Sequence, residues 1–265
     1  MAIHLEECSA KLKKHLFLRT EPLGIGMLKV GEEKPDGFLQ PCKDLGYHLS
    51  TCQGFALSRR SRMSLCMTMD DMWCFEPVVG YGLAEPPEDF LQGHNRYPGT
   101  ASSLEAGRQW ASSMPRFETG QYQGVLSAPL SSFPRDRSPH VVIIYCDPSQ
   151  LTHIMRAVNW IDGHDIYSRI SAHAACVYAV IPTMLENSFQ VVVPCGGDRR
   201  RAAAQDNEII FSSPIEKLEK LVEALDAIGE ADGGLPVQFT LKEEYPLEPH
   251  YRKMGLEIGM KLDRE

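Results

Sequence analysis

The stretch "HVVIIYCDPSQLTHIMRAVNWIDG", residues 140–163, carries the strongest fold signal in the chain. Its first part is a continuous apolar run, which is typical of a strand covered on both faces of a sheet. Its second part begins with the turn-forming residues Asp147 and Pro148 and ends at Gly163, as a helix does. A buried strand followed directly by a helix predicts a sheet packed against helices.

The alternation of strands and helices continues on both sides of this stretch. Further strands are expected at residues 21–30, 124–130, 189–195, 207–214 and 236–241, and helices at 5–18, 49–62, 102–115, 171–185 and 213–234. The Met-rich residues 63–83 predict an irregular buried segment. Interleaved strands and helices predict an α/β (or α+β) fold, with a mixed sheet covered by helices in a single compact domain over residues 1–265.

Composition narrows the range of partners. The 265 residues are 43% hydrophobic and 23% charged, so a packed core is expected. The net charge of -8 argues against a protein that tracks nucleic-acid phosphates. No stretch of the sequence approaches the roughly 18 consecutive apolar residues of a membrane span. The N-terminal residues are typical of an amphipathic helix and not of a signal peptide. We expect a cytoplasmic protein with a small-molecule substrate and with no nucleic-acid or membrane partner; a homo-oligomer stays open.

The cysteines are the main candidates for functional residues in this sequence. Their positions are 8, 42, 52, 66, 74, 146, 176 and 195. Structural disulfides are not expected, because cytosolic thiols are kept reduced. No two cysteines form a C-x-x-C pair, so neither a zinc ribbon nor a thioredoxin-like motif has local support. Any cluster of cysteines must therefore be assembled by the fold.

The segment "VVVPCGGDRRR", residues 191–201, combines a strand, a cysteine, two glycines and three arginines. Ligands tend to bind beyond the carboxyl ends of strands, where Cys195 is expected. Gly196 and Gly197 would let backbone N–H groups approach a ligand, and Arg199 would grip a carboxylate or phosphate with two hydrogen bonds. A structural turn with a packed cysteine explains the same residues.

Four other residues are candidates for chemistry. Cys146 also closes a strand, so it is expected at the same rim of the sheet as Cys195. His173 and Cys176 would share a helix face and could bind a metal or form a thiolate–imidazolium pair, although packing in a small-residue helix explains them too. Cys52 would follow Thr51 as helix N-cap, which predicts a lowered thiol pKa.

The remaining candidates have simpler interpretations. His94, Arg96 and Tyr97 are expected on a surface loop. The cluster of Asp162, His164 and Asp165 is explained by a turn that ends a helix. The common phosphate-binding, dinucleotide-binding, hydrolase and zinc-protease motifs are absent from the sequence.

Four segments together resemble a known family. "TCQGFALSRR", "WCFEPVVGYGL", "SAHAACVYAVIP" and "VPCGGDRR" occur in the order and wording of the proteins grouped as domain of unknown function 169. "GQYQGVLSAPL" is similar to the segment before that family's "PDVV" strand, where this chain has His140 in place of the aspartate. The resemblance covers about residues 20–227 and leaves residues 228–265 as a C-terminal extension.

The resemblance implies a set of site residues. The family's cysteine motifs correspond to Cys52, Cys74, Cys176 and Cys195, and its C-x-G-x-R signature to Cys195, Gly197 and Arg199. Four thiols from four dispersed segments match the ligand count of a [4Fe–4S] iron–sulfur cluster or a Cys₄ zinc site. The cluster is favoured, because structural zinc prefers closely spaced cysteine pairs; haem and flavin stay open. Cys8, Cys42, Cys66 and Cys146 fall outside the pattern and are expected to be structural.

The favoured function is an oxygen-sensitive iron–sulfur enzyme of anaerobic metabolism, a lyase, hydratase or reductase. It would act on a small anionic or aromatic organic substrate by Lewis-acid or redox chemistry. Arg199 would hold the substrate's anionic group, and His173 would serve as acid or base. A non-catalytic cofactor carrier or a thiol or metal sensor is the first alternative. A metal-free hydrolase or lyase with Cys52 or Cys176 as nucleophile is the second, and cysteines that only pack are the third.

Overall fold

The computed structural model of the chain describes residues 4–232 and 249–260. The chain divides into two units, Met1–Leu235 and Pro236–Glu265. In the second unit the described residues form one helix, α10 (Pro249–Glu257). The strand expected at residues 236–241 lies outside the described residues. Over the described ranges, no helix has both the length and the apolar character needed to cross a membrane.

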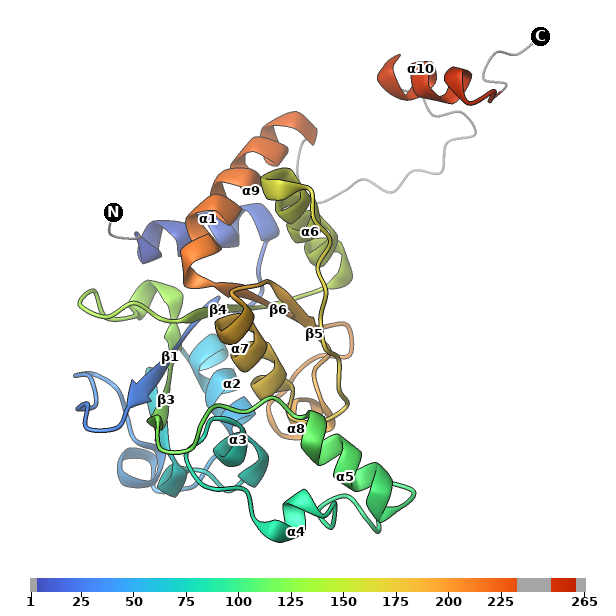
Figure 1. Cartoon of the computed structure of the whole chain (residues 1–265). Coiled ribbons are helices and arrows are strands. Elements are labelled where there is room, and N and C mark those ends of the chain that lie inside the picture. Colours follow the sequence, from blue (N-terminus) through green and yellow to red (C-terminus); the bar gives the residue numbers. More distant parts are fainter. Residues whose placement is uncertain (1–3, 233–248, 261–265) are drawn as a thin grey trace. The chain divides into compact units, whose positions relative to one another are not determined.

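The first unit is built on a six-stranded sheet with the order β2-β3-β1-β4-β6-β5 (Figure 1). Its strands are β1 (Leu23–Lys29), β2 (Leu65–Thr68), β3 (Tyr122–Pro129), β4 (Val141–Cys146), β5 (Gln190–Val192) and β6 (Ile209–Pro214). All pairings between these strands are antiparallel, and only two isolated bridges outside them are parallel. The α+β alternative is therefore confirmed. The expected mixed sheet is an antiparallel one, because the order of elements along a chain does not determine strand direction.

Helices surround this sheet. The α-helices are α1 (Leu5–Leu16), α2 (Thr51–Ser61), α3 (Phe75–Gly80), α4 (Glu88–Leu91), α5 (Leu104–Ser113), α6 (Pro148–Asp162), α7 (Ala175–Glu186), α8 (Gly196–Arg201) and α9 (Leu218–Asp232). Shorter helical turns are the π-helix η1 (Pro41–Leu45) and the 3₁₀-helices η2 (Met69–Asp71), η3 (Leu130–Ser132) and η4 (Ile215–Lys217). The helices expected near residues 5–18, 49–62, 102–115 and 213–234 are all present.

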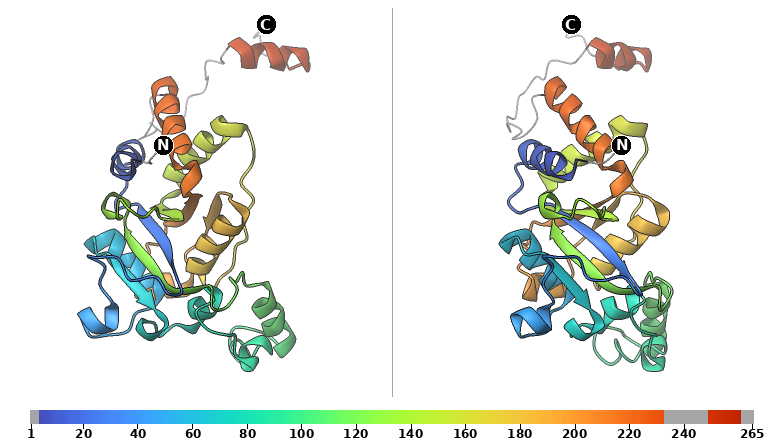
Figure 2. Two further views of the ribbon diagram at one scale, coloured as in Figure 1. Left: turned by 60° about the vertical axis from the view of Figure 1, so that its left-hand side comes forward. Right: turned by 90° about the vertical axis from the view of Figure 1, so that its left-hand side faces the viewer.

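Strand β4 is buried along its whole length, as its continuous apolar sequence predicts. Alternate side chains enter two different cores because successive residues of a strand point to opposite faces. Val141, Ile143 and Tyr145 pack in the core that includes α7, whereas Val142, Ile144 and Cys146 pack in the core of α1, α6 and α9. Figures 1 and 2 show α1, α6 and α9 on one side of the sheet and α2 and α7 on the other.

Two helix starts differ from the sequence-based expectation, and both bear on the site. Ser50, not Thr51, is the N-cap of α2, where its hydroxyl accepts the backbone N–H of Gln53 in a capping box. Helix α7 begins only at Ala175, after Ala174 in the left-handed conformation (φ 53°). His173 therefore precedes the helix, and the expectation that it shares a helical face with Cys176 is wrong.

Close packing of α3 on α7 brings the Met-rich segment to the same end of the molecule as α7 (Figure 1). A Cβ atom on Gly80 would lie 2.9 Å from a methyl carbon of Val177, so the contact requires glycine. Next to it, the fully buried Tyr81 donates its hydroxyl to the carbonyl oxygen of Cys176 at 2.9 Å. These contacts hold the end of α3 near the start of α7, and Cys74 directly precedes α3. The expected irregular segment thus contains three regular elements, β2, η2 and α3.

Candidate functional site

All four cysteines singled out by the resemblance meet at one cavity of about 180 Å³, which we call the cysteine pocket. Helices α2, α3, α7 and α8 and their preceding residues supply most of its wall. The residues that line it are Ser50, Thr51, Cys52, Trp73, Cys74, Glu76, Pro77, Arg96, His173, Ala174, Cys176, Cys195, Gly197 and Arg201. Residues separated by more than 140 positions in sequence are therefore assembled by the fold.

Each of these cysteines lies at the beginning of a helix. Cys52 and Cys176 are the second residues of α2 and α7, and Cys74 and Cys195 directly precede α3 and α8. The first N–H groups of a helix lack partners within the helix and favour a negative charge close by. Because α2 and α7 have 11 and 12 residues, their N-termini contribute most to this effect. The pocket is thus suited to an anionic group or to thiolates.

Cys52 is the thiol whose pKa was expected to be low. It is 7% exposed, and its Sγ lies 3.1 Å from the hydroxyl of Ser50. Burial and the nearby Asp198 nevertheless raise its pKa to about 12. Desolvation of the thiolate therefore outweighs the helix N-terminus, and the expectation of a lowered pKa is wrong.

Cys74 belongs to a chain of polar contacts along one wall. Its thiol donates to Glu76 Oε2 at 3.1 Å, and Arg96 donates to the other carboxylate oxygen at 2.9 Å. The guanidinium of Arg96 also lies 4.0 Å from the centre of the Trp110 ring. Burial and then the charge of Glu76 raise the pKa of Cys74. The carboxylate of Glu76 thus accepts a hydrogen bond from this thiol and favours its protonated form.

Cys195 and Asp198 hold each other at the start of α8. The Cys195 Sγ accepts the backbone N–H of Asp198, and the Asp198 carboxylate accepts the backbone N–H of Cys195 at 3.1 Å. Asp198 is fully buried and also accepts the hydroxyl of Tyr145 at 3.3 Å. Burial raises the pKa of Asp198, and burial and then Asp198 raise the pKa of Cys195. The reciprocal bonds fix the direction of the Cys195 side chain.

The four thiols are close enough to interact electrostatically. The pKa of Cys176 is raised by burial first, and its charged form is further disfavoured by Cys52, Cys195 and Cys74. Gly197 keeps space open between two of them: a Cβ atom there would lie 3.4 Å from the Cys195 Sγ and 3.8 Å from the Cys52 Sγ. The thiols therefore border a common space.

The arrangement does not match the ligand set of a single metal ion. Within residues 4–232 and 249–260, no three His, Cys, Asp or Glu side chains are grouped to hold one ion. A tetrahedral zinc ion, with Zn–S bonds of about 2.3 Å, needs its sulfurs roughly 4 Å apart. The four pocket cysteines line a cavity of about 180 Å³.

Two arginines line the pocket, and neither is Arg199. The Arg199 guanidinium donates to the carbonyl of Gln205 at 2.7 Å and lies 3.7 Å from the Asp206 carboxylate. Arg201, two residues on, lines the pocket, as does Arg96. Arg96 has only 12% of its side chain exposed, so its expected place on a surface loop is wrong. Its partner is 20 residues away in sequence, and no local motif indicated the pairing.

The other predicted site residues are placed as follows. His173 lines the pocket, with its ring edge-to-face on Trp110 at 5.7 Å. Burial and then Arg96 lower its pKa, which favours the neutral imidazole. Gly197 lines the pocket, whereas a Cβ on Gly196 would meet nothing within 4 Å and Gly196 is not part of the wall.

The remaining four cysteines lie elsewhere, and all eight are free. Cys8, Cys42, Cys66 and Cys146 do not line the pocket. Cys146 packs on the opposite face of the sheet with α6 and α9, and burial raises its pKa to about 12. It therefore does not share a rim with Cys195, and that expectation is wrong.

Comparison with known proteins agrees with the resemblance. The family described as DUF169, Uncharacterised ArCR, matches residues 11–224. An uncharacterized protein of Methanocaldococcus jannaschii is 24% identical over 225 residues, which cover 84% of this chain and 94% of the relative. No solved structure was found to match. The matched region includes all the residues that line the cysteine pocket. The chain belongs to the domain of unknown function 169 family.

Proposed function

We propose that the protein is an iron–sulfur enzyme of the cytoplasm, with a cluster of the [4Fe–4S] type bound by Cys52, Cys74, Cys176 and Cys195. One observation carries the proposal: four cysteines from four separate segments line a single pocket. The cytoplasm keeps thiols reduced, which suits a chain whose eight cysteines are all free.

The chemistry of the donor set supports a metal cluster. Soft thiolate ligands select iron–sulfur clusters, zinc or copper(I). All four pocket thiols have raised pKa values, so bringing them to the thiolate form requires a compensating positive centre. The four thiols line a cavity of about 180 Å³, which offers room for an occupant with several metal atoms.

The surroundings support catalysis. When bound, a cluster would supply electrons or, with three cysteine ligands, an open iron site that acts as a Lewis acid. The chain itself would bind the substrate in the concave wall between Trp73 and His173. The neutral imidazole of His173 would take up or give a proton there, while Pro77 and the Trp73 ring would exclude water.

The composition of the pocket also helps to distinguish the proposed enzyme from a carrier or sensor and from a cysteine-nucleophile enzyme. A carrier or sensor needs only an exposed cluster, whereas here the cysteines share a cavity with an imidazole and two guanidinium groups. A cysteine nucleophile needs a lowered thiol pKa, and all four pocket thiols have the opposite shift. Both observations favour the cluster-dependent enzyme.

The test is a count of iron and acid-labile sulfide in protein purified without oxygen. We expect about four irons and four sulfides per chain and a brown visible spectrum. Cys195→Ser is expected to lose both, while Cys146→Ser, which alters a buried cysteine outside the pocket, keeps them. Colourless wild-type protein with neither element, or a single zinc in place of iron, would overturn the proposal.

A further inference from the structure

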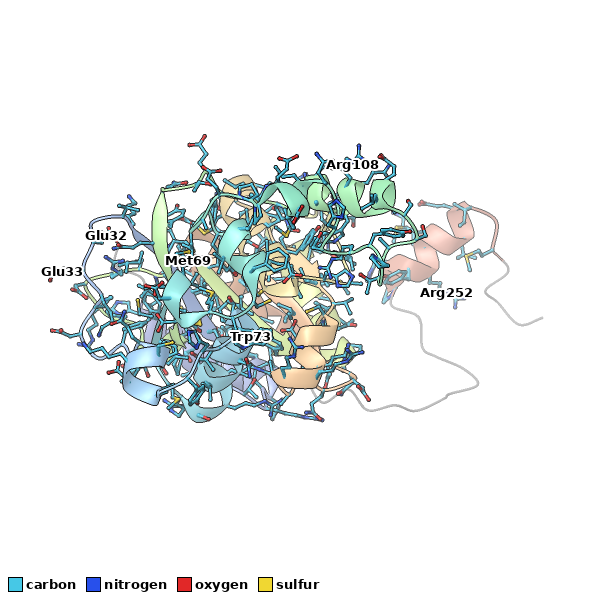
Figure 3. All side chains as sticks on the ribbon, turned by 90° about the horizontal axis from the view of Figure 1, so that it is seen from below. Glu32, Glu33, Met69, Trp73, Arg108 and Arg252 are labelled. Atoms are coloured by element: carbon cyan, nitrogen blue, oxygen red, sulfur yellow. The ribbon has the colours of Figure 1, made fainter. Side chains whose placement is uncertain are left out.

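Arg201 is positioned at the cysteine pocket by an aromatic ring. Its guanidinium carbon lies 4.4 Å from the centre of the Trp73 ring, and both residues line the pocket. Trp73 is 44% exposed and is labelled in the view of Figure 3. Stacking of this kind attracts the cation to the ring and limits the orientations of the guanidinium. The exposed Arg201 side chain therefore lies over the Trp73 ring at the wall of the pocket.

The ring itself is held by the start of α2. The indole Nε1 of Trp73 donates to Gln53 Oε1 at 3.0 Å, and the same oxygen accepts the backbone N–H of Ser50 at 2.9 Å. Ser50 in turn contacts the thiol of Cys52. One capping box thus orients both a proposed cluster ligand and the platform under Arg201.

The hydrogen-bonding edge of Arg201 is available, unlike the edges of Arg96 and Arg199. Arg96 is bound to Glu76, and Arg199 to the carbonyl of Gln205 and to Asp206. Over residues 4–232, Arg201 has no hydrogen-bond acceptor and no ion-pair partner, and its one contact of this kind is with the ring of Trp73. An arginine fork that is oriented but unpaired at a pocket is suited to binding a planar oxyanion from a ligand.

We propose that Arg201, stacked on Trp73, binds the carboxylate of a small organic acid in the cysteine pocket. A guanidinium fork matches a carboxylate with two parallel hydrogen bonds. The cavity of about 180 Å³ is smaller than most ligand pockets, which span roughly 300–1,000 Å³, so its volume suits a small organic acid. With one unpaired guanidinium in the wall, the ligand class is a monocarboxylate. This inference deepens the proposed function and rests on it for the reaction, but not for binding.

The experiment titrates protein purified without oxygen with sodium propionate and sodium benzoate at constant ionic strength. Succinate and inorganic phosphate are the comparison anions, and isothermal calorimetry gives each Kd. Wild type is expected to bind at least one monocarboxylate more tightly than either comparison anion. Arg201→Gln is expected to weaken that binding by about tenfold or more, because it removes a charge-assisted pair of hydrogen bonds. Arg201→Lys should fall between the two, since an ammonium lacks the planar fork.

Arg200→Gln is the matched control, because it removes the same charge one position away and Arg200 does not line the pocket. The Kd of this variant should stay within about twofold of wild type, a much smaller change than the loss of a charge-assisted pair of hydrogen bonds would cause. The proposal is overturned if no monocarboxylate binds at millimolar concentration, if phosphate or succinate binds more tightly, or if Arg200→Gln weakens binding as much as Arg201→Gln. The iron count distinguishes the failure of one proposal from the failure of the other. Arg201-dependent binding by iron-free protein would refute only the iron–sulfur cluster. A full cluster without Arg201-dependent binding would refute only the carboxylate site at Arg201.

Discussion

The cysteines of this protein form two sets that differ in position and not in burial. The pocket cysteines are Cys52, Cys74, Cys176 and Cys195, and the remaining cysteines are Cys8, Cys42, Cys66 and Cys146. Cys176 and Cys8 are both 6% exposed, and burial raises the pKa of each. Burial therefore does not distinguish a candidate ligand from a packed cysteine here.

The backbone does distinguish Cys52 and Cys176 from Cys8 and Cys66. Cys8 lies inside α1 and Cys66 inside β2, where the backbone N–H groups are committed to the helix or the sheet. Cys52 and Cys176 lie in the first turn of a helix, where N–H groups have no intrahelical partner. A cysteine inside a helix or a strand can thus serve as a small hydrophobic side chain, whereas a cysteine in the first turn of a helix can serve as an anionic ligand. The following experiments test that difference.

The largest effect is expected from exchanging single cysteines for serine across both sets. Each exchange among the pocket cysteines should remove most of the bound iron, because a hydroxyl is a poor replacement for a thiolate at iron. Exchanges of Cys8, Cys66 and Cys146 should leave the iron content of the folded protein unchanged. Iron and sulfide assays on anaerobically purified variants measure this. Equal losses in both sets would show that the two sets do not differ in function.

A second experiment fills the space between two pocket thiols. Gly197→Ala would place a methyl group 3.4 Å from the Cys195 Sγ and 3.8 Å from the Cys52 Sγ, whereas Gly196→Ala meets nothing within 4 Å. Both positions are in α8, so each exchange should stabilise this helix by up to about 1 kcal/mol through the higher helix propensity of alanine. Only Gly197→Ala is expected to lower iron loading, as measured by reconstitution with iron and sulfide. Normal loading of Gly197→Ala would mean that the cluster does not occupy this space.

A third experiment compares two helix caps. Ser50 caps α2 beside Cys52, and Ser103 caps α5 by accepting the N–H of Ala106 at 3.1 Å. Either serine-to-alanine exchange should lower the free energy of unfolding by about 1 kcal/mol in urea titrations. Ser50→Ala should also change the alkylation rate of Cys52 in iron-free protein, because the hydroxyl 3.1 Å from its sulfur is lost. An unchanged alkylation rate would show that the hydroxyl of Ser50 does not affect the reactivity of the Cys52 thiol.

The smallest effect concerns pH. Burial and then Arg96 lower the pKa of His173 below 6.5, so at mildly acidic pH the unfolded chain binds more protons than the folded one. The stability that the neutral imidazole contributes is present above the ordinary pKa of 6.5 and is lost as the pH falls below it. The difference in free energy of unfolding between wild type and His173→Gln should therefore shrink from pH 7 to about pH 5. A difference that grows on acidification would contradict the direction of this pKa shift.

Sequence patterns predicted the parts of the fold that depend on local signals. The continuous apolar run of residues 141–146 indicated a strand covered on both faces, and Asp147 and Gly163 marked the ends of α6. The cap of α2 was misplaced by one residue, because Ser50 and Thr51 are both competent caps. The start of α7 was predicted too early, since the left-handed conformation of Ala174 has no signature in an alanine-rich segment.

The site was predictable in its cysteines and not in its charges. The ordered motifs of the family indicated which four thiols to single out, although the sequence between them is too long to show that they meet. Which arginine of the run 199–201 reaches the pocket depends on the direction of the short helix α8, and this direction is set by tertiary packing. Arg96 acquires its place through Glu76 and Trp110, two contacts that no local pattern encodes.

The central claim is that the cysteine pocket holds a cluster of iron and sulfide. Its most direct test is anomalous diffraction at the iron absorption edge from crystals of protein purified without oxygen. The account predicts a strong iron signal in the cavity between α2, α3, α7 and α8, bonded to the Sγ atoms of at least three of Cys52, Cys74, Cys176 and Cys195. An iron-free pocket in such crystals, or a single zinc ion bound there, would contradict it.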